Sequence, residues 1–344
     1  MKLLVTGGAG FIGCNAVARA LGRGDEVVCL DNLSRRGADA NLAWLKAHPN
    51  ATALHVRVAD IRVQAEVEAT FRDHPDIEAV IHLAGQVAVT TSVLDPRGDF
   101  EANALGTLNV LEAARRAPRL RALLYASTNK VYGGLEQVGV EMRDGRYAFR
   151  DLPAGVPETY PLDFHSPYGC SKGAADQYAI DYARIYGLPS VSLRQSCIYG
   201  PRQLGVEDQG WVAWFTIAAV TGRPITIFGD GRQVRDVLYV DDLLDAYDAA
   251  IARIDAVKGT AINLGGGPEN VLAISEVLDH VGPRLGRDVP TDHAEWRPGD
   301  QRVFVADITR ARDLLGWTPR VSVASGIGRL FDWVVANKDR FTSG

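Results

Sequence analysis

Short apolar runs alternate with helix-like segments through the first two-thirds of this 344-residue chain, and that alternation narrows the possible folds more than any other feature. Strands buried on both faces read as nearly continuous apolar runs, and helical patterns between them indicate βαβ units. We therefore expect an α/β fold built on a doubly wound parallel sheet. The expected strands cover residues 2–6, 26–31, 53–58, 79–84, 122–127 and 190–194, and the clearest expected helices cover 100–117 and 169–187.

The pattern changes beyond about residue 200. The segments 200–234 and 268–344 are richer in Arg, Pro, Gly and Trp, whereas AINLGG at 261–266 has the form of a returning strand of the first sheet. A chain of this length is typical of two domains, or of one large α/β unit with an appendage. We expect residues 1–195 plus about 235–267 to form the sheet domain, and about 196–234 plus 268–344 to form a smaller C-terminal lobe that binds the substrate.

Composition and residue spacing argue against nucleic-acid binding, a membrane segment, disulfides and a metal site. The chain is 47% hydrophobic and 23% charged, and its net charge of −5 with no long basic block argues against nucleic acid. No apolar run reaches the ~18 residues of a membrane helix, and the first strand begins at Lys2, so we expect no membrane segment, no signal peptide and a cytoplasmic location. No Cys or His pair has ligand spacing, so we expect neither disulfides nor a metal site; the cysteines are Cys14, Cys29, Cys170 and Cys197.

A glycine-rich turn joins the first expected strand to a helix. Gly7, Gly10 and Gly13 in GGAGFIG let the turn be tight and let a pyrophosphate approach backbone N–H groups at the helix start, where the helix dipole favours negative charge. Asp31 ends the next strand, where its carboxylate can hold both hydroxyls of an adenosine ribose and repel a 2′-phosphate. The arginines at 35–36 could instead favour NADP. Because Asp31 stands at the strand tip itself, we expect a Rossmann domain that binds NAD.

Tyr168 and Lys172 lie four residues apart after the fifth strand, and Thr128 follows that strand directly. Positions i and i+4 share one face of any helix, so an ordinary surface helix would also show this pair. Oxidation of a carbinol needs a base for the hydroxyl proton, and a tyrosine with a pKa near 10 is a weak base at pH 7. A lysine cation one turn away, together with a positive nicotinamide ring, should lower that pKa. Thr128 can hydrogen-bond the reacting oxygen, so these residue types suit hydride chemistry.

Five motifs in order resemble one known family. GGAGFIG, Asp31, HLAGQ (82–86), STNKVYG (127–133) and YGCSK (168–172) together resemble the extended short-chain dehydrogenase/reductase family of nucleotide-sugar epimerases and dehydratases. The resemblance implies that Thr128, Tyr168 and Lys172 are catalytic and that NAD is the cofactor. For Asn103 a structural amide is an equally good interpretation. The implied cofactor-binding residues are Gly7, Gly10, Phe11, Ile12, Gly13, Asp31, Asn32, Ser34, Arg35, Asp60, Ile61, Leu83, Ala84, Gly85, Gln86, Asn103, Ser127, Tyr168, Lys172 and Gln195.

The same resemblance implies a nucleotide-sugar substrate held by the second lobe. Paired arginine forks suit phosphate oxygens, Phe228 is a candidate stacking surface for the base, and Trp211 either shapes the sugar pocket or is structural. The family also implies a homodimer, or a dimer of dimers, formed through the helices at 100–117 and 169–187. The implied substrate-binding residues are Gln86, Thr128, Cys197, Gln209, Trp211, Phe228, Arg235 and Arg297.

The residues after Thr128 distinguish the reactions of this family. Sugar 4,6-dehydratases normally carry Asp-Glu there, but this chain has Asn129 and Lys130, so elimination of water would lack its acid/base pair. Cys170, inside the YGCSK turn, is best interpreted as a small packing residue. What remains is oxidation of a carbinol followed by re-reduction from the other face. That sequence is epimerisation with no net redox change, which makes the expected enzyme an isomerase.

The expected site of inversion is C2. The usual 4-epimerase pattern has Asn where Cys197 stands, and three blocks (82–92, 162–188 and 208–215) resemble the members that invert C2 of CDP-linked hexoses or deoxyhexoses such as CDP-paratose. A UDP-hexose 4-epimerase is the alternative within the family. A non-catalytic NAD-binding regulator is the alternative of another class, because fold alone does not fix function. The intact catalytic trio argues against a regulator.

Overall fold

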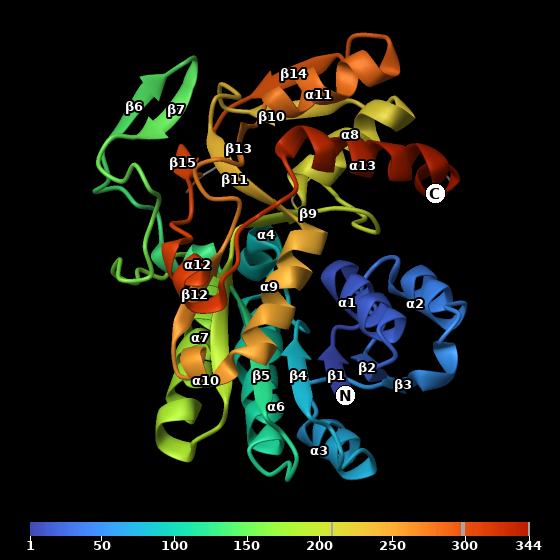
Figure 1. The fold of residues 1–344 in the computed structure, drawn as a ribbon. Helices are drawn as coiled ribbons and strands as arrows, with labels where there is room; N and C mark the ends of the chain where they lie inside the picture. Colours follow the sequence, from blue (N-terminus) through green and yellow to red (C-terminus); the bar gives the residue numbers. More distant parts are fainter. Residues whose placement is uncertain (208, 297–299, 343–344) are drawn as a thin grey trace.

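The computed structural model describes residues 1–207, 209–296 and 300–342, and its central layer is a seven-stranded sheet (Figure 1). The strand order is β12-β8-β5-β4-β1-β2-β3, and every neighbouring pair is parallel. The chain winds outward from β1 through β2 and β3, then crosses to β4 on the other side of β1, so the expected doubly wound sheet is confirmed. The strands are β1 (Lys2–Thr6), β2 (Glu26–Asp31), β3 (Leu54–Val58), β4 (Ala79–His82), β5 (Ala122–Thr128), β8 (Ser190–Gln195) and β12 (Ala261–Leu264).

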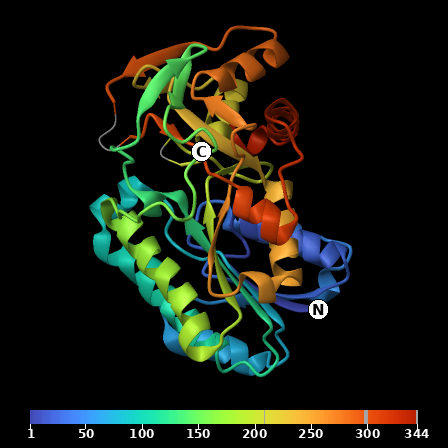
Figure 2. The same ribbon diagram turned by 60° about the vertical axis from the view of Figure 1, so that its left-hand side comes forward.

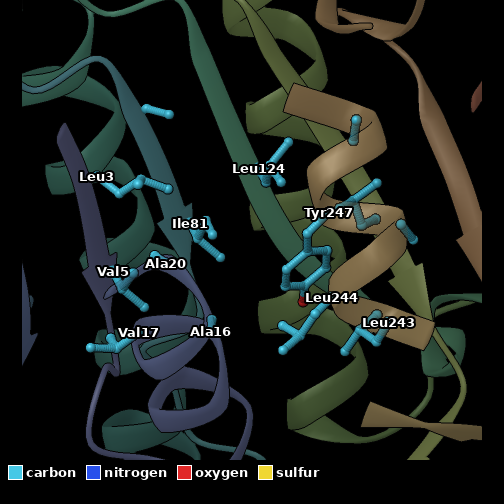
Figure 3. Packing of buried hydrophobic residues seen from close by; sticks show 14 of the residues in the cluster. Leu3, Val5, Ala16, Val17, Ala20, Ile81, Leu124, Leu243, Leu244 and Tyr247 are labelled. Carbon is cyan, nitrogen blue, oxygen red and sulfur yellow. The ribbon is translucent and has the colours of Figure 1, made fainter. Parts of the chain in front are cut away.

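Helices cover both faces of this sheet (Figures 1 and 2). Successive side chains of a strand point to opposite faces, so Leu3 and Val5 join one core with α1 and α9, whereas Leu4 joins a second core with α3, α6 and α7. Figure 3 shows the first core, with Tyr247 of α9 beside Leu124 of β5. The helices are α1 (Phe11–Gly22), α2 (Ala38–Lys46), α3 (Gln64–Asp73), α6 (Gly106–Ala114), α7 (Ser166–Tyr186), α9 (Val240–Ala252), α10 (Ile254–Val257) and α12 (Thr309–Leu315).

A second group of elements lies at the carboxyl end of the sheet (Figure 2). Strand β8 of the sheet leads directly into β9, the first strand of this group. Here β11 pairs with β9, β13 and β15, β10 pairs with β14, and the four helices of this group contribute to a separate core. The expected boundary at about 235 assigns β11 to the sheet domain, whereas its pairing partners belong to this second group; the domain limits stay a prediction. The elements are β9 (Cys197–Tyr199), α8 (Trp211–Thr221), β10 (Ile225–Phe228), β11 (Val234–Tyr239), β13 (Val271–Ala273), α11 (Glu276–Leu285), β14 (Thr291–Ala294), β15 (Val303–Phe304), α13 (Val323–Ala336) and α14 (Asp339–Thr342).

Some segments differ from the expected elements. The helix expected over 100–117 is continuous in direction but contains a π-helical turn, η2 (Glu101–Leu105), and ends three residues early because α6 stops at Ala114. The segment between β5 and α7 forms a hairpin that the sequence pattern did not indicate. No helix in the described ranges is long and apolar enough to cross a membrane. The remaining elements are η1 (Ala51–Ala53), α4 (Val89–Leu94), α5 (Pro96–Phe100), η3 (Asn129–Tyr132), β6 (Val140–Arg143) and β7 (Arg146–Phe149).

Candidate active site

The glycine turn between β1 and α1 is shaped for close approach of a ligand. Gly7 has a φ of +68°, and a Cβ on Gly13 would lie 2.0 Å from the carbonyl oxygen of Gly7, so neither position accepts a side chain without strain. Gly10 precedes α1, and no side chain caps this helix. The N–H groups of its first turn therefore remain available, and a helix N-terminus favours an anion. These features fit the pyrophosphate of a dinucleotide.

Asp31 ends β2 beside this turn. Its carboxylate accepts hydrogen bonds from the backbone N–H of Ala9 at 2.9 Å and of Leu33 at 2.8 Å, which fix its orientation at the strand tip. Arg35, which could have favoured a 2′-phosphate, donates to the side chain of Gln209. Burial lowers the pKa of the Arg35 guanidinium. Gln209, expected in the sugar pocket, is thus found against the loop that follows Asp31.

Four other residues expected to bind the cofactor gather at the tips of β2 and β3. Asn32 donates to a carboxylate oxygen of Asp60 at 3.0 Å, and the hydroxyl of Ser34 donates to Asn32 at 2.7 Å. Hydrogen bonds from Arg62 lower the pKa of Asp60 to about 2, so this carboxylate is charged at neutral pH. Ile61 is buried next to it.

The loop after β4 runs between the glycine turn and η2. The backbone N–H groups of Leu83 and Ala84 both donate to the hydroxyl of Thr6 at 3.2 Å. A Cβ on Gly85 would lie 2.6 Å from Oδ1 of Asn103, so the loop passes directly over that amide. Within the described part of the chain, this Oδ1 is buried without a hydrogen-bond partner. An orphaned buried acceptor beside a nucleotide turn fits a donor group of a bound dinucleotide.

The structure brings the three expected catalytic side chains together. Thr128 ends β5, and its hydroxyl is hydrogen-bonded to that of Tyr168, in the first turn of α7. Lys172 follows one turn later, and its ammonium donates to the carbonyl oxygen of Ala126 at 2.5 Å. The same ammonium lies 4.5 Å from the centre of the Tyr125 ring. The trio is buried at the carboxyl end of the sheet, where ligands bind in doubly wound folds.

Burial is the largest influence on the pKa values of the two titratable members of the trio, Tyr168 and Lys172. It raises the pKa of Tyr168 above the usual value of 10.0, and the hydrogen bond with Thr128 only partly offsets this. Burial also lowers the pKa of Lys172 to about 8, against the opposing charges of Asp176 and Asp99. In the protein alone the pKa of Tyr168 is thus raised, because desolvation of the phenolate is the largest influence; the lowering expected from Lys172 together with a positive nicotinamide ring stays a prediction.

A buried carboxylate that sequence reasoning missed ties the trio to the loop after β4. Asp99 of α5 accepts hydrogen bonds from Ser171 at 2.5 Å, from Gln86 at 2.9 Å and from Asn103 at 3.1 Å. These donors come from α7, from the HLAGQ loop and from η2. The available signal was the spacing of Asp99 four residues before Asn103, since such residues share a helix face.

A second missed carboxylate anchors α7 on β8. Asp176 accepts two hydrogen bonds from the guanidinium of Arg194, at 2.9 and 3.1 Å, and one from Ser192 at 2.5 Å. Burial acts to raise the pKa of Asp176, but the hydrogen bonds from Arg194 and Ser192 outweigh it and lower the pKa. Asp176 stands one turn beyond Lys172, so the sequence did contain a spacing signal.

Three residues expected to contact the substrate meet where the two groups of elements join. Cys197 lies in β9, and burial raises the pKa of its thiol against the opposing charge of Arg235. Trp211 begins α8, and its buried Nε1 has no hydrogen-bond partner among the described residues. Arg235 of β11 pairs with Asp300 at 3.1 Å. Lys130, just beyond the end of β5, faces this junction. The charge of Arg235 lowers the pKa of Lys130, whereas Asp300 and Cys197 raise it.

Two other expected residues, Gln195 and Phe228, lie elsewhere in the structure. Gln195 donates to the hydroxyl of Tyr247 at 2.5 Å, in the core beneath α9. Phe228 is half-buried at the end of β10. Arg297 lies outside the described residues. Within those residues, no group of three or more His, Cys, Asp or Glu side chains is arranged to hold a metal ion.

Comparison with known proteins identifies the class of protein that this fold and site define. Residues 3–265 match the NAD dependent epimerase/dehydratase family. A CDP-paratose 2-epimerase of Salmonella typhi is 45% identical over 97% of this chain and 99% of its own length. A UDP-glucose 4-epimerase of Mycolicibacterium smegmatis is 35% identical over 97% of this chain and 98% of its own. The solved structure of a Thermus thermophilus UDP-glucose 4-epimerase in complex with NAD covers 100% of both chains, at 35% identity and a TM-score of 0.80.

The chain therefore belongs to the NAD dependent epimerase/dehydratase family. It is an NAD-dependent epimerase, and hence an isomerase, which confirms the expected family, the expected class of enzyme and the expected cofactor. The Rossmann-type fold agrees with that of solved epimerases.

Proposed function

We propose that this epimerase inverts C2 of a CDP-linked hexose or deoxyhexose, such as CDP-paratose. The observation that carries the proposal is the 45% identity to the CDP-paratose 2-epimerase, which extends over 97% of the chain. Asn129 and Lys130 support it, because they stand where elimination of water would need an acid and a base. Cys197 supports inversion at C2 rather than C4, since it replaces the Asn of the 4-epimerase pattern.

Thr128, Tyr168 and Lys172 form the catalytic group of this proposal. Bound NAD would accept a hydride from one carbon of the sugar and later return it to the same carbon. Tyr168 takes the hydroxyl proton as that carbon is oxidised, and gives a proton back to the same oxygen as the carbon is reduced. Thr128 orients this oxygen through the hydrogen bond that it shares with Tyr168. Lys172, with a pKa of about 8, is mostly protonated at pH 7 and favours the phenolate during the transfer.

The keto sugar must turn its other face between the two hydride transfers, so the pocket has to hold the nucleotide while the ring moves. Arg235, with Arg297 beyond the described residues, would hold the diphosphate, and Phe228 would stack on the base. Gln86, Thr128, Cys197 and Trp211 would line the space for the sugar, with Gln209 on the side nearest Arg35. Fixed contacts at one end and room at the other allow the rotation that epimerisation requires.

The expected cofactor contacts divide along the dinucleotide. The glycine turn would hold the pyrophosphate, Asp31 the adenosine ribose, and Asp60 with Ile61 the adenine. The loop after β4 would follow the remaining half, where the orphaned Oδ1 of Asn103 offers an acceptor. The other proposed contacts are Phe11, Ile12, Asn32, Ser34, Arg35, Ser127 and Gln195.

Self-association through the helices around α7 is also part of the proposal. Long apolar side chains rarely stay exposed in a group on a monomer surface. Leu94 is 86% exposed and Ile185 is 66% exposed, and α4, α5 and η2 all pack beside α7. A homodimer would cover this surface. Its exposed apolar residues are Val93, Leu94, Phe100, Leu105, Tyr178, Ile185 and Tyr186.

Product analysis tests the proposed substrate. The purified protein is incubated separately with CDP-, UDP- and GDP-linked hexoses, and the coupling between the protons on C1 and C2 is followed by NMR. We expect a new C2-inverted product from a CDP-sugar only. A galacto-configured product from a UDP-sugar, with the CDP-sugars inert, would instead establish the second candidate.

That second candidate is a UDP-hexose 4-epimerase. It is favoured by the 35% identity to the mycobacterial UDP-glucose 4-epimerase and by the likeness to solved 4-epimerases, with a TM-score of 0.84 for the Thermotoga maritima enzyme. Both candidates use the same catalytic group, because a hydroxyl at either carbon needs the same base. The distinction therefore depends on how the pocket presents the sugar.

A further inference from the structure

Lys130 is a shielded cation that the proposed catalytic steps do not use. It lies in η3, two residues beyond Thr128, at the carboxyl end of β5. Its ammonium donates to Oε1 of Gln301 at 3.4 Å, and Gln301 is itself buried and held by the carbonyl oxygen of Gly133. Across residues 1–207, 209–296 and 300–342, no carboxylate forms an ion pair with Lys130. The ammonium can donate three hydrogen bonds, so its capacity is largely unused.

The groups that face Lys130 leave positive charge in excess. Burial is the largest influence and lowers the pKa of Lys130 to about 8; Arg235 of β11 lowers it further, whereas Asp300 and Cys197 of β9 raise it. Asp300 is already the partner of Arg235, at 3.1 Å. Burial raises the pKa of the Cys197 thiol, so that group is neutral at pH 7. Two cations therefore share one carboxylate.

An uncompensated cation in a shielded site costs free energy unless an anion enters. The anion must have several oxygens, because both Lys130 and Arg235 have donors to satisfy. It must also lie near Thr128, which the proposed mechanism places at the reacting oxygen. The diphosphate of a nucleotide sugar meets both conditions, and its sugar-linked phosphate is the part closest to the reacting ring.

We propose that Lys130 binds the sugar-linked phosphate of the substrate diphosphate, beside Arg235. This inference rests on the proposed function, since it requires a nucleoside diphosphate sugar. It assigns Lys130 to substrate binding rather than to proton transfer. The residue would fix the phosphate end of the substrate while the sugar ring turns.

Binding of product nucleotides, measured by calorimetry on the NAD-loaded protein, tests the contact without any turnover. CDP has the phosphate that corresponds to the sugar-linked one, whereas CMP lacks it. Lys130→Met removes the charge and keeps the length of the side chain. We expect this variant to bind CDP about ten- to hundredfold more weakly, as for the loss of a hydrogen bond to a charged group, and to bind CMP within about twofold of the parent. UDP and UMP are measured in parallel.

Controls separate a local contact from general damage. Lys338→Met, at an exposed position, should leave CDP binding unchanged, and the NAD content of each variant reports folding. Unchanged CDP binding in Lys130→Met would overturn the proposal, and so would an equal loss for CDP and CMP. If the parent protein binds neither CDP nor UDP, the proposed function itself fails. That outcome differs from the other two because it needs no variant.

The pH dependence of CDP binding gives a second readout. A bound phosphate favours the protonated lysine, so the parent protein should bind CDP fully below a pH of about 8 and progressively more weakly above it. Lys130→Arg keeps its charge to high pH, so its CDP affinity should stay level between pH 7 and pH 9.5. Parallel pH profiles for the parent protein and Lys130→Arg would contradict the assignment.

Discussion

Asp176→Asn removes one charge from a buried ion pair while keeping the shape of the side chain. Asp176 is fully buried and Arg194 is 4% exposed, and the two hydrogen bonds between them measure 2.9 and 3.1 Å. Removing one partner of a buried pair costs about 3–5 kcal/mol, because the other charge stays buried without compensation. Arg194 keeps hydrogen bonds to the hydroxyl of Tyr132 at 3.1 Å and to the carbonyl of Glu158 at 3.4 Å. We therefore expect a loss near the lower end, about 3 kcal/mol.

Urea unfolding, with the NAD content held constant, measures this loss as a change in the free energy of unfolding. Asp181→Asn is the matched control, because it removes a carboxylate from an exposed position on the same helix and should change the free energy by less than about 0.5 kcal/mol. Adding Arg194→Met to Asp176→Asn should recover part of the loss, since no unpaired charge then remains. A loss below about 1 kcal/mol for Asp176→Asn would refute the reasoning.

The pH dependence of the stability loss in Asp176→Asn follows from the direction in which the fold shifts the pKa of Asp176. The pKa of Asp176 is lower in the folded protein than its usual value, so its contribution to stability is present above the unfolded pKa of about 3.9. That contribution is lost as the pH falls through the folded pKa. The difference in stability between the parent protein and Asp176→Asn should therefore be constant from pH 7 to pH 5 and should shrink below about pH 4. A difference that grows toward acid pH would contradict this assignment.

Three other outcomes follow from the site and the surface. Gly13→Val should purify without NAD, because its Cβ would lie 2.0 Å from the carbonyl oxygen of Gly7; the nucleotide released on denaturation shows this, and full NAD content would contradict it. Tyr168→Phe should lose about 10²–10⁴-fold in turnover yet keep its NAD, and near-normal turnover would exclude Tyr168 as the base. Leu94→Glu, on the exposed apolar surface around α7, should shift the mass in light scattering from dimer to monomer, and a parent protein that is already monomeric would refute the proposed contact.

Local sequence patterns were sufficient to predict the sheet and the glycine turn. Strands such as β1 and β5 read as apolar runs because both of their faces are buried, and the glycine turn is fixed by contacts between residues a few positions apart. The trio could also be located, because Thr128 ends a strand and Tyr168 and Lys172 share one helix face. The glycine turn and the helix face that Tyr168 and Lys172 share each depend on residues only a few positions apart.

Contacts between distant segments could not be predicted in this way. Asp99 receives its hydrogen bond from Ser171 across 72 positions, and Gln209 meets Arg35 across 174. The pKa of Tyr168 depends on how completely the fold buries it, which the spacing to Lys172 does not reveal. The excess charge around Lys130 likewise emerges only when β9, β11 and the end of β5 are brought together.

The fate of the hydrogen on C2 tests the central claim most directly. A CDP-linked hexose is epimerised by the NAD-loaded protein in D₂O, and the product is examined by NMR for deuterium at C2. If C2 is oxidised and reduced by hydride transfer, the original hydrogen returns to the same carbon without meeting solvent, and the product should contain no deuterium there. Deuterium at C2 of the inverted product would show that the carbon is deprotonated instead, and would contradict the roles assigned to Thr128, Tyr168 and Lys172.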